Sequence, residues 1–368
     1  FPWWWAAALA AVTVCAAGGW FVARLKPDSP PTFRRLTFRR GDISDSRFAP
    51  DGKTVIYSSE WDGAPSEIFS LAPGNRESRT LGLPPGRLMA LSAQGEIAML
   101  LSGGAEGTLA RVPLADGVPR AVIEDVSAAD WSPDGSKLAV IRSINGRNRV
   151  EYPPGTVLYE TTGRPPYLLR VSPKGDLAAF FDYDPAVGDF AVAVAGPGVP
   201  KRNLCTGWRG VTGIAWAPSG DEVWFTAAHV AADPWIWSVS LKGKIRQRAQ
   251  VPGWLALRDI DRNGRILVQT INSRTAIAFR GARDSREKDL SWLDTSYVFD
   301  ISRDAKQVLF VELSYGEGRN QAIYVRGTDG TPAVLLGFGN RPSLSPDGKQ
   351  VAALHDEAGK SQVVVFST

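Results

Sequence analysis

Paired carboxylates are the residues of this chain whose spacing first suggests chemistry. Asp182 and Asp184 are separated by one tyrosine, and Asp259 and Asp261 by one isoleucine. Two carboxylates this close can hold a calcium ion or act as acid and base on a glycoside. Aspartates also cap tight turns by accepting backbone hydrogen bonds. We favour this structural interpretation and predict no metal site.

Histidines add little to this chemistry. The chain has two, His229 in an alanine-rich loop and His355 near the C-terminus. A metal centre needs several such ligands together. The sequence also lacks the Gly-x-Ser-x-Gly phrase, the P-loop and the dinucleotide-binding fingerprint. We predict a chain without catalytic residues or cofactors, with an enzyme that uses Asp182, Asp184, Asp259 and His229 as the alternative.

Loop tryptophans, arginines and aspartates instead predict a binding surface. Tryptophan and arginine contribute strongly to binding at protein interfaces. For any single tryptophan, packing between sheets is the competing role. The candidate binding residues are Trp61, Asp62, Arg142, Arg147, Asp182, Asp184, Trp208, Arg209, Trp254, Trp292, Asp294 and Tyr315.

A phrase that returns about every forty residues predicts the elements that position these loops. An apolar residue is followed by Ser-Pro-Asp-Gly or a variant, with clear copies at 131–135 and 344–348. The glycine position falls at residues 52, 95, 135, 175, 220, 264, 305 and 348, with alanine at 305. A repeat of roughly 40–45 residues is the spacing of a four-stranded propeller blade.

Each copy of the phrase predicts a tight turn between two strands. Proline ends the first strand because it has no N–H to donate, and glycine adopts the positive φ of the turn. Runs rich in β-branched and aromatic residues follow, as at 54–58, 137–141 and 307–311. Trp131 and Trp216 end inner strands and are expected in the core.

The two ends of the repeat array predict how the ring closes. After the last turn only two strands remain, 350–354 and 362–366, whereas a strand-like segment, 33–38, precedes the first repeat. Pairing 33–38 with the last repeat would remove an open sheet edge. We therefore predict an all-β fold in which 33–368 forms an eight-bladed β-propeller, with 33–38 as its latch. Seven blades are the alternative.

The first residues have a different composition. No charge occurs from 1 to 23, and tryptophans stand near both ends of this stretch. Its length suffices to cross a bilayer. We predict a transmembrane helix over 1–24 and a proline-rich linker over 25–32, with a signal peptide as the alternative. Because the chain begins with Phe rather than Met, we expect a further module upstream.

Charge and cysteines exclude some functions. A net charge of +4 over 368 residues does not predict a nucleic-acid-binding surface. Arg24 and Lys26 follow the apolar stretch and by themselves would place the propeller in the cytoplasm. Cys15 and Cys205 lie in different segments and are not expected to pair.

Taken together, these segments resemble a known family. The repeats are similar to WD40-like propellers of the Ser-Pro-Asp-Gly, or TolB-like, type. The order of apolar helix, linker, Leu-Thr-Phe-Arg-Arg-Gly at 36–41 and Ser-Trp-Leu-Asp at 291–294 is more specific. It resembles the C-terminal extracytoplasmic propeller of bacterial membrane-anchored serine/threonine protein kinases and of related winged-helix regulators. The kinase signature phrases themselves are absent from this sequence.

The resemblance implies a propeller on the periplasmic side of the bacterial inner membrane, joined by one helix to a cytoplasmic kinase or DNA-binding module. It supplies no catalytic residues. Expected partners are a protein, peptide or glycan outside the membrane and lipid around residues 3–23, with no nucleic acid. We predict a non-catalytic sensor or protein-interaction module. A TolB-like cell-envelope scaffold is one alternative, and a propeller enzyme or peptidase-gating propeller is the other.

Overall fold

The computed structural model describes residues 32–39, 41–101, 104–115, 117–229, 234–249, 253–271, 274–317, 320–357 and 359–368. It divides into two units, Phe1–Phe38 and Arg39–Thr368. The described residues form strands and no helix, so they contain no helix that could cross a bilayer. The transmembrane helix predicted over 1–24 and all but the last residue of the linker lie outside the described residues.

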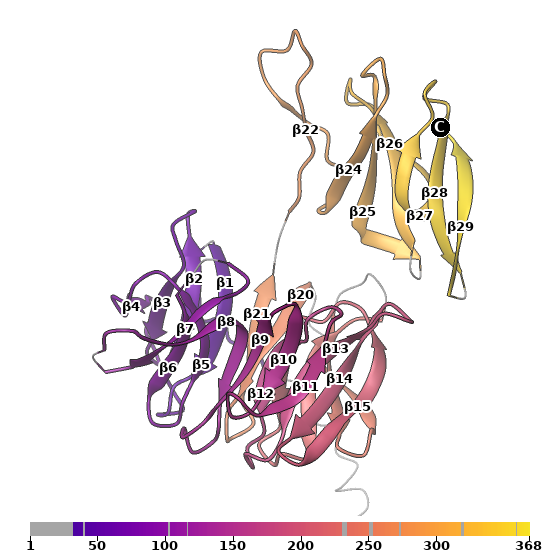
Figure 1. Cartoon of the computed structure of the whole chain (residues 1–368). Coiled ribbons are helices and arrows are strands. Elements are labelled where there is room, and N and C mark those ends of the chain that lie inside the picture. Colours follow the sequence, from indigo (N-terminus) through magenta and orange to yellow (C-terminus); the bar gives the residue numbers. More distant parts are fainter. Residues whose placement is uncertain are drawn as a thin grey trace, which may run out of the picture. The chain divides into compact units, whose positions relative to one another are not determined.

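Strands of the first five repeats pair antiparallel in chain order (Figure 1). Strand β8 belongs to two repeats, because its first half pairs with β7 and its second half with β9. The strands are β1 (Gly41–Phe48), β2 (Val55–Trp61), β3 (Glu67–Leu71), β4 (Arg79–Thr80), β5 (Arg87–Leu91), β6 (Glu96–Leu100), β7 (Gly107–Pro113), β8 (Arg120–Trp131), β9 (Leu138–Ile144), β10 (Arg147–Glu151), β11 (Val157–Thr161), β12 (Tyr167–Val171), β13 (Ala178–Asp184), β14 (Asp189–Gly196), β15 (Val199–Trp208), β16 (Gly213–Trp216), β17 (Glu222–Ala227), β18 (Trp235–Ser240) and β19 (Ile245–Ala249).

The later repeats form three further sheets. Strand β20 pairs with β21, β22 pairs with β23, and β24 to β29 form one six-stranded sheet in chain order. Strand β27 is shared in the same way as β8. The strands are β20 (Trp254–Ile260), β21 (Ile266–Ile271), β22 (Ala278–Phe279), β23 (Lys288–Asp289), β24 (Ser296–Ile301), β25 (Gln307–Glu317), β26 (Asn320–Gly327), β27 (Val334–Leu344), β28 (Gln350–Glu357) and β29 (Lys360–Ser367).

The same turn occurs in all eight repeats, as the phrase predicts. The residue at the glycine position donates its N–H to the carbonyl three residues earlier, at 2.8 to 3.0 Å. Its φ lies between 55° and 78° in every copy, including the one with Ala305. The predicted repeat unit is therefore confirmed at the level of local structure.

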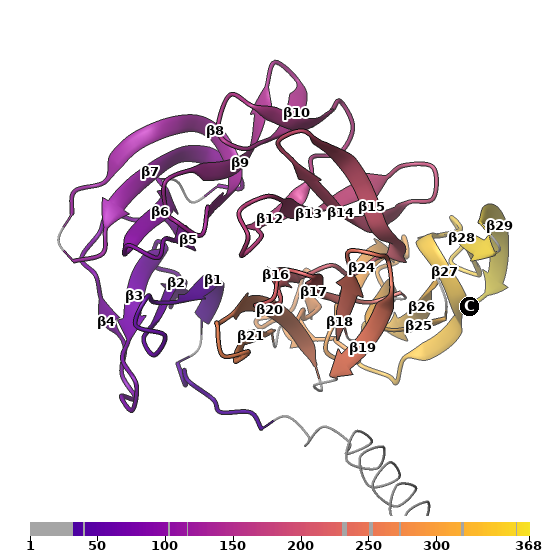
Figure 2. The same ribbon diagram turned by 90° about the horizontal axis from the view of Figure 1, so that it is seen from below.

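Inner strands, the first strand of each repeat, contact one another in chain order. Contacts run from β1 through β5, β8, β12, β16 and β20, and β20 contacts β1 again. Figure 2 shows β1, β5, β12, β16 and β20 around a common centre. The backbone N–H of Phe48 donates to Asp259 Oδ2 at 2.9 Å, which joins the sixth repeat to the first. These six inner strands form a closed circuit.

This closure differs from the predicted one. A ring of eight blades, or of seven, is not confirmed, because β1 contacts β20 and the last two repeats form the β24–β29 sheet. The predicted latch is not found either: described residues 32–38 contain no strand, and β29 has β28 as its sheet neighbour. A carboxylate on an inner strand makes the closing bond, so an added outer strand is not required.

Apolar side chains packed between neighbouring sheets form the core. Trp131 and Trp216 are each 5% exposed, as predicted, and Phe180, Phe181 and Phe225 are fully buried. Trp216 Nε1 donates to the Arg170 carbonyl at 3.0 Å, so the polar atom of this buried ring has a partner in the neighbouring repeat.

Replacing Ala305 by glycine should stabilise the turn in which it lies. Its φ of 55° places a side chain in the left-handed region, which glycine tolerates better. We expect Ala305→Gly to raise the free energy of unfolding by about 0.5–1 kcal/mol, after allowance for the greater freedom of glycine in the unfolded chain.

Gly52 provides the matched control in urea unfolding. Its φ is 63°, and a Cβ built there meets nothing within 4 Å, so Gly52→Ala adds backbone strain without a clash. This variant should lose about 1 kcal/mol. Equal destabilisation by both substitutions would contradict the equivalence of the turns.

Candidate binding cavity

A cavity of about 610 Å³ is lined by the inner strands. Its wall comes from β1, β5, β8, β12 and β20, from Phe190 of β14 and from loop residues 105–106, 164–166 and 209–211. These loops join second to third strands or fourth to first strands, so they lie at the end opposite the recurring turns. The volume lies within the range of small-ligand pockets.

Charged residues recur at one position of the inner strands, the fifth residue before the turn residue. Their side chains come close to one another inside the circuit, where Arg47 pairs with Asp45 and Arg170 Nη2 lies 3.9 Å from Asp45 Oδ1. In the first six repeats this position holds Arg47, Ala90, Asp130, Arg170, Ala215 and Asp259. We call its four charged residues, together with Asp45, the charged layer.

Arg47 and Asp45 form a bidentate pair within this layer. Arg47 is 4% exposed, its Nη2 lies 3.0 Å from Asp45 Oδ2, and its Nη1 bonds the other carboxylate oxygen. Arg47 Nη2 also donates to the Met89 carbonyl at 2.6 Å. Burial alone would raise the pKa of Asp45, but Arg47, followed by Arg170 and Arg258, holds it below its usual value. Asp45 is therefore ionised at neutral pH.

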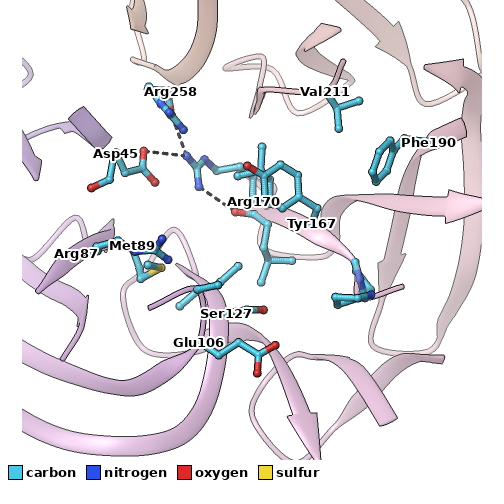
Figure 3. A pocket seen from close by; sticks show the side chains of 18 of the residues that line it. Asp45, Arg87, Met89, Glu106, Ser127, Tyr167, Arg170, Phe190, Val211 and Arg258 are labelled. Carbon is cyan, nitrogen blue, oxygen red and sulfur yellow. Dashed lines mark hydrogen bonds and ion pairs between the residues drawn. The ribbon is translucent and has the colours of Figure 1, made fainter. Parts of the chain in front are cut away.

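Arg170 crosses the charged layer from the fourth repeat. Its Nη1 donates to the Leu169 carbonyl and its Nη2 to the Arg258 carbonyl, both at 2.9 Å. Its Nη2 lies 3.9 Å from Asp45 Oδ1. Figure 3 shows Arg170, Asp45 and Arg258 together at one end of the cavity. These bonds fix the position of the guanidinium group.

The other two carboxylates of the layer link neighbouring inner strands. Asp130 Oδ2 accepts the Val171 N–H at 2.7 Å, and Asp259 Oδ2 accepts that of Phe48 at 2.9 Å. Burial raises the pKa of Asp130, against the opposing effects of Arg170 and Arg47. Burial therefore disfavours the ionised form of the Asp130 side chain.

Further arginines line the wall toward the loops. Arg209 Nε donates to Asp189 Oδ1 at 3.1 Å, and Arg258 Nε donates to Gln269 Oε1 at 2.8 Å. Arg164 lies over an aromatic ring at 4.8 Å, that of Tyr183. The wall is therefore rich in guanidinium groups.

Among the candidate aromatic residues whose side chains the structure describes, none lines this cavity. Trp61 and Trp208 are buried in the core, at 6% and 0% exposure. Trp254 and Trp292 are 43% and 41% exposed. Tyr315 lies in β25. The competing role of packing in the core is therefore confirmed for Trp61 and Trp208. Ligand contact by Trp254, Trp292 and Tyr315 stays a prediction.

Among the charged candidates, only Arg209 lines the cavity. Most of the others bond to nearby protein groups. The pairs are Asp62 with Arg39 at 2.7 Å, Arg142 with Glu151 at 4.0 Å, Arg147 with Glu160 at 2.6 Å, Asp182 with the Tyr159 hydroxyl at 3.2 Å and with Lys201, and Asp184 with the Ala186 N–H at 2.9 Å. Asp294 is exposed. A ligand role for these residues also stays a prediction.

Histidines and cysteine form no reactive cluster in the described ranges. His229 Nδ1 lies 2.9 Å from the Gly207 carbonyl, and its ring stacks on Trp208 at 4.0 Å. His355 Nδ1 lies 3.0 Å from the Phe338 carbonyl. Burial raises the pKa of the Cys205 thiol to about 11. No group of three potential metal ligands occurs among the residues described.

Sequence reasoning missed most of the cavity wall, including Arg87, Arg164, Arg170 and Arg258. A signal was present, because charged residues interrupt apolar inner strands at a fixed distance from the turn. That signal becomes visible only once the repeats are aligned on their turn residues. The convergence of the strands on one cavity is a property of the tertiary structure.

The sheets and their central cavity define the class: a repeat protein with the architecture of a β-propeller. No family model matches the chain, and no curated protein matches it. It is similar to solved structures that include the following three. TolB from Acinetobacter baumannii has 15% identity and a TM-score of 0.38, over 89% of this chain and 76% of that one.

The second is the hydrazine synthase of Kuenenia stuttgartiensis, with 13% identity and a TM-score of 0.43, over 90% of this chain and 99% of that one. The third, a puromycin-hydrolyzing peptidase of Mycobacterium tuberculosis, has 14% identity and a TM-score of 0.41, over 92% of this chain and 54% of that one. We draw no function from similarities at this level.

Asp130 makes the stability of the protein depend on pH. Because its pKa is raised on folding, the folded protein keeps a proton that the unfolded chain releases above the usual value of 3.8. Stability from this group is present below that pH and is lost as pH rises through the raised pKa. Asp130→Asn keeps an acceptor for Val171 and removes the titration.

We therefore expect the stability of Asp130→Asn, relative to the unsubstituted protein, to improve from pH 4 upward and then level off. Urea unfolding midpoints across this range measure the difference. Asp347→Asn, in an exposed turn, is the control; the pKa of Asp347 is lowered by its bonds to Ser345 and Lys349, so its effect has the opposite sign. A constant difference for Asp130→Asn would contradict the prediction.

Proposed function

We propose that this chain is the non-catalytic binding propeller of a cell-envelope protein, and that its ligand enters the central cavity. The observation that carries the proposal is the cavity itself, which reaches the loop end and has a wall rich in arginine. The ligand is a protein or peptide segment, or a glycan, small enough in cross-section to enter between the loops.

The bonding of the candidate catalytic acids supports a binding role over a catalytic one. Asp182 accepts the Tyr159 hydroxyl, and Asp184 accepts the Ala186 N–H. Asp259 accepts the Phe48 and Ile260 N–H groups, each at 2.9 Å. Carboxylates held by such bonds act as structural links.

The cellular setting of the proposal comes from the sequence. The apolar stretch at 1–24 and the resemblance to membrane-anchored kinases and winged-helix regulators support a tethered sensor on the periplasmic side of the inner membrane. A TolB-like scaffold in an envelope complex remains the alternative function.

Filling the cavity tests the proposal. Val211 lines the cavity, and Val199 is exposed on β15 outside it. We expect the full chain to capture partners from envelope extract, and Val211→Trp to reduce that capture about tenfold because its ring occupies the space a ligand needs. Val199→Trp should capture as the unsubstituted protein does.

Quantitative mass spectrometry of the captured proteins supplies the readout. Equal capture by both variants would place binding outside the cavity. The sensor and scaffold roles are separated in cells: a reporter of the upstream module should lose its response when residues 33–368 are deleted. An unchanged response would favour the scaffold.

A further inference from the structure

Two arginines of the cavity wall, Arg87 and Arg164, make no hydrogen bond or ion pair with the described residues, and Arg164 lies over the Tyr183 ring. Arg87 begins β5, and its side chain makes no hydrogen bond or ion pair with any residue that the structure describes, while its Nε atom is buried. Arg209 and Arg258 of the same wall bond to Asp189 and Gln269. A buried guanidinium N–H without an acceptor is costly, so Arg87 is a donor that the folded chain leaves unused.

Charge around the cavity has a positive excess at the same place. Among the described residues that line it, there are five arginines and two carboxylates. The arginines are Arg87, Arg164, Arg170, Arg209 and Arg258, and the carboxylates are Asp45 and Glu106. Because Asp45 pairs with Arg47 and Arg209 pairs with Asp189, positive charge remains in the wall, and Arg87 contributes to it.

A second positive charge lies in the same wall. Arg170 is 9% exposed, its two Nη atoms are held by carbonyl groups, and its Nε is buried without a partner, so it contributes charge more than a free donor. Figure 3 shows Arg87, Arg170 and Arg258 around the same end of the cavity. Apolar residues, among them Val211 and Phe190, line other parts of the wall.

We propose that Arg87, aided by the positive charge of Arg170 in the same wall, binds one oxyanion, a carboxylate or phosphate group, at the end of a ligand whose body is apolar. Guanidinium groups suit this role because their N–H donors match the two oxygens of such an anion. The inference rests on the proposed function and deepens it by naming the chemical group that the cavity selects. It also explains why an unpaired arginine is held in a buried wall.

Small probes test this site in the full chain. N-acetyl-leucine carries a carboxylate on an apolar body, N-acetyl-leucinamide is its neutral analogue, and inorganic phosphate represents the other oxyanion. Isothermal titration calorimetry at matched ionic strength should show binding of at least one anion and none of the amide. Binding of N-acetyl-leucine would identify a carboxylate as the group that the cavity accepts, and binding of inorganic phosphate would identify a phosphate.

Substitutions then assign the binding to Arg87. Arg87→Gln should weaken anion binding about tenfold or more, and Arg87→Lys should weaken it less because the charge stays. Arg79→Gln, at an exposed residue of β4, should leave it unchanged. Binding that survives Arg87→Gln, equal binding of acid and amide, or failure of both anions to bind would overturn the proposal.

Unfolding without ligand gives an independent measurement. Because Arg87 lacks a partner in the fold, Arg87→Gln should leave the urea midpoint the same or higher, whereas a structural arginine would lower it when removed. Failure of this site differs from failure of the proposed function. Partner capture that Arg87→Gln leaves intact would reject the oxyanion site alone, and Arg87-dependent anion binding without partner capture would reject the function alone.

Discussion

The hydrogen bond from an inner-strand carboxylate to the backbone of the next inner strand is the interaction on which this architecture depends. Asp130 holds Val171, Asp259 holds Phe48, and Asp300 holds Leu344 at 3.0 Å in the β24–β29 sheet. Apolar packing brings sheets face to face but does not fix their register, because it is non-directional. A carboxylate that accepts one particular N–H does fix it, and the bond to Phe48 closes the circuit.

Those carboxylates determine the character of the cavity. A buried charge needs partners, and Arg47 and Arg170 supply opposite charges within the layer while bonding to Asp45 and to carbonyl groups. The centre of the circuit is therefore ionic and well bonded at one end. Arginines outnumber acids among the residues that line the wall, and this excess of positive charge is what the proposed ligand site depends on.

The two ends of each repeat differ: one carries the recurring turn, and the other carries the loops that reach the cavity. At one end, the Ser-Pro-Asp-Gly turn is nearly invariant in geometry, because its positive φ and its backbone bond leave little freedom. At the other end, the loops differ in length and composition and supply Arg164 and Arg209 to the cavity. Variation in length and composition thus occurs at the end where we propose that the ligand binds.

Local features could be read from the sequence because they depend on neighbouring residues. The turn phrase predicted eight equivalent turns, the strands beside them and the burial of Trp131 and Trp216. The closing contact and the cavity wall could not be read in this way. Phe48 and Asp259 are 211 residues apart in the sequence. Whether Arg87 has a bonding partner depends on residues that only the fold brings near it. The sequence by itself determined the repeat, since turn and strand preferences are local; the tertiary structure decided which strands close the circuit and which arginine faces the cavity, since long-range packing and charge pairing set both.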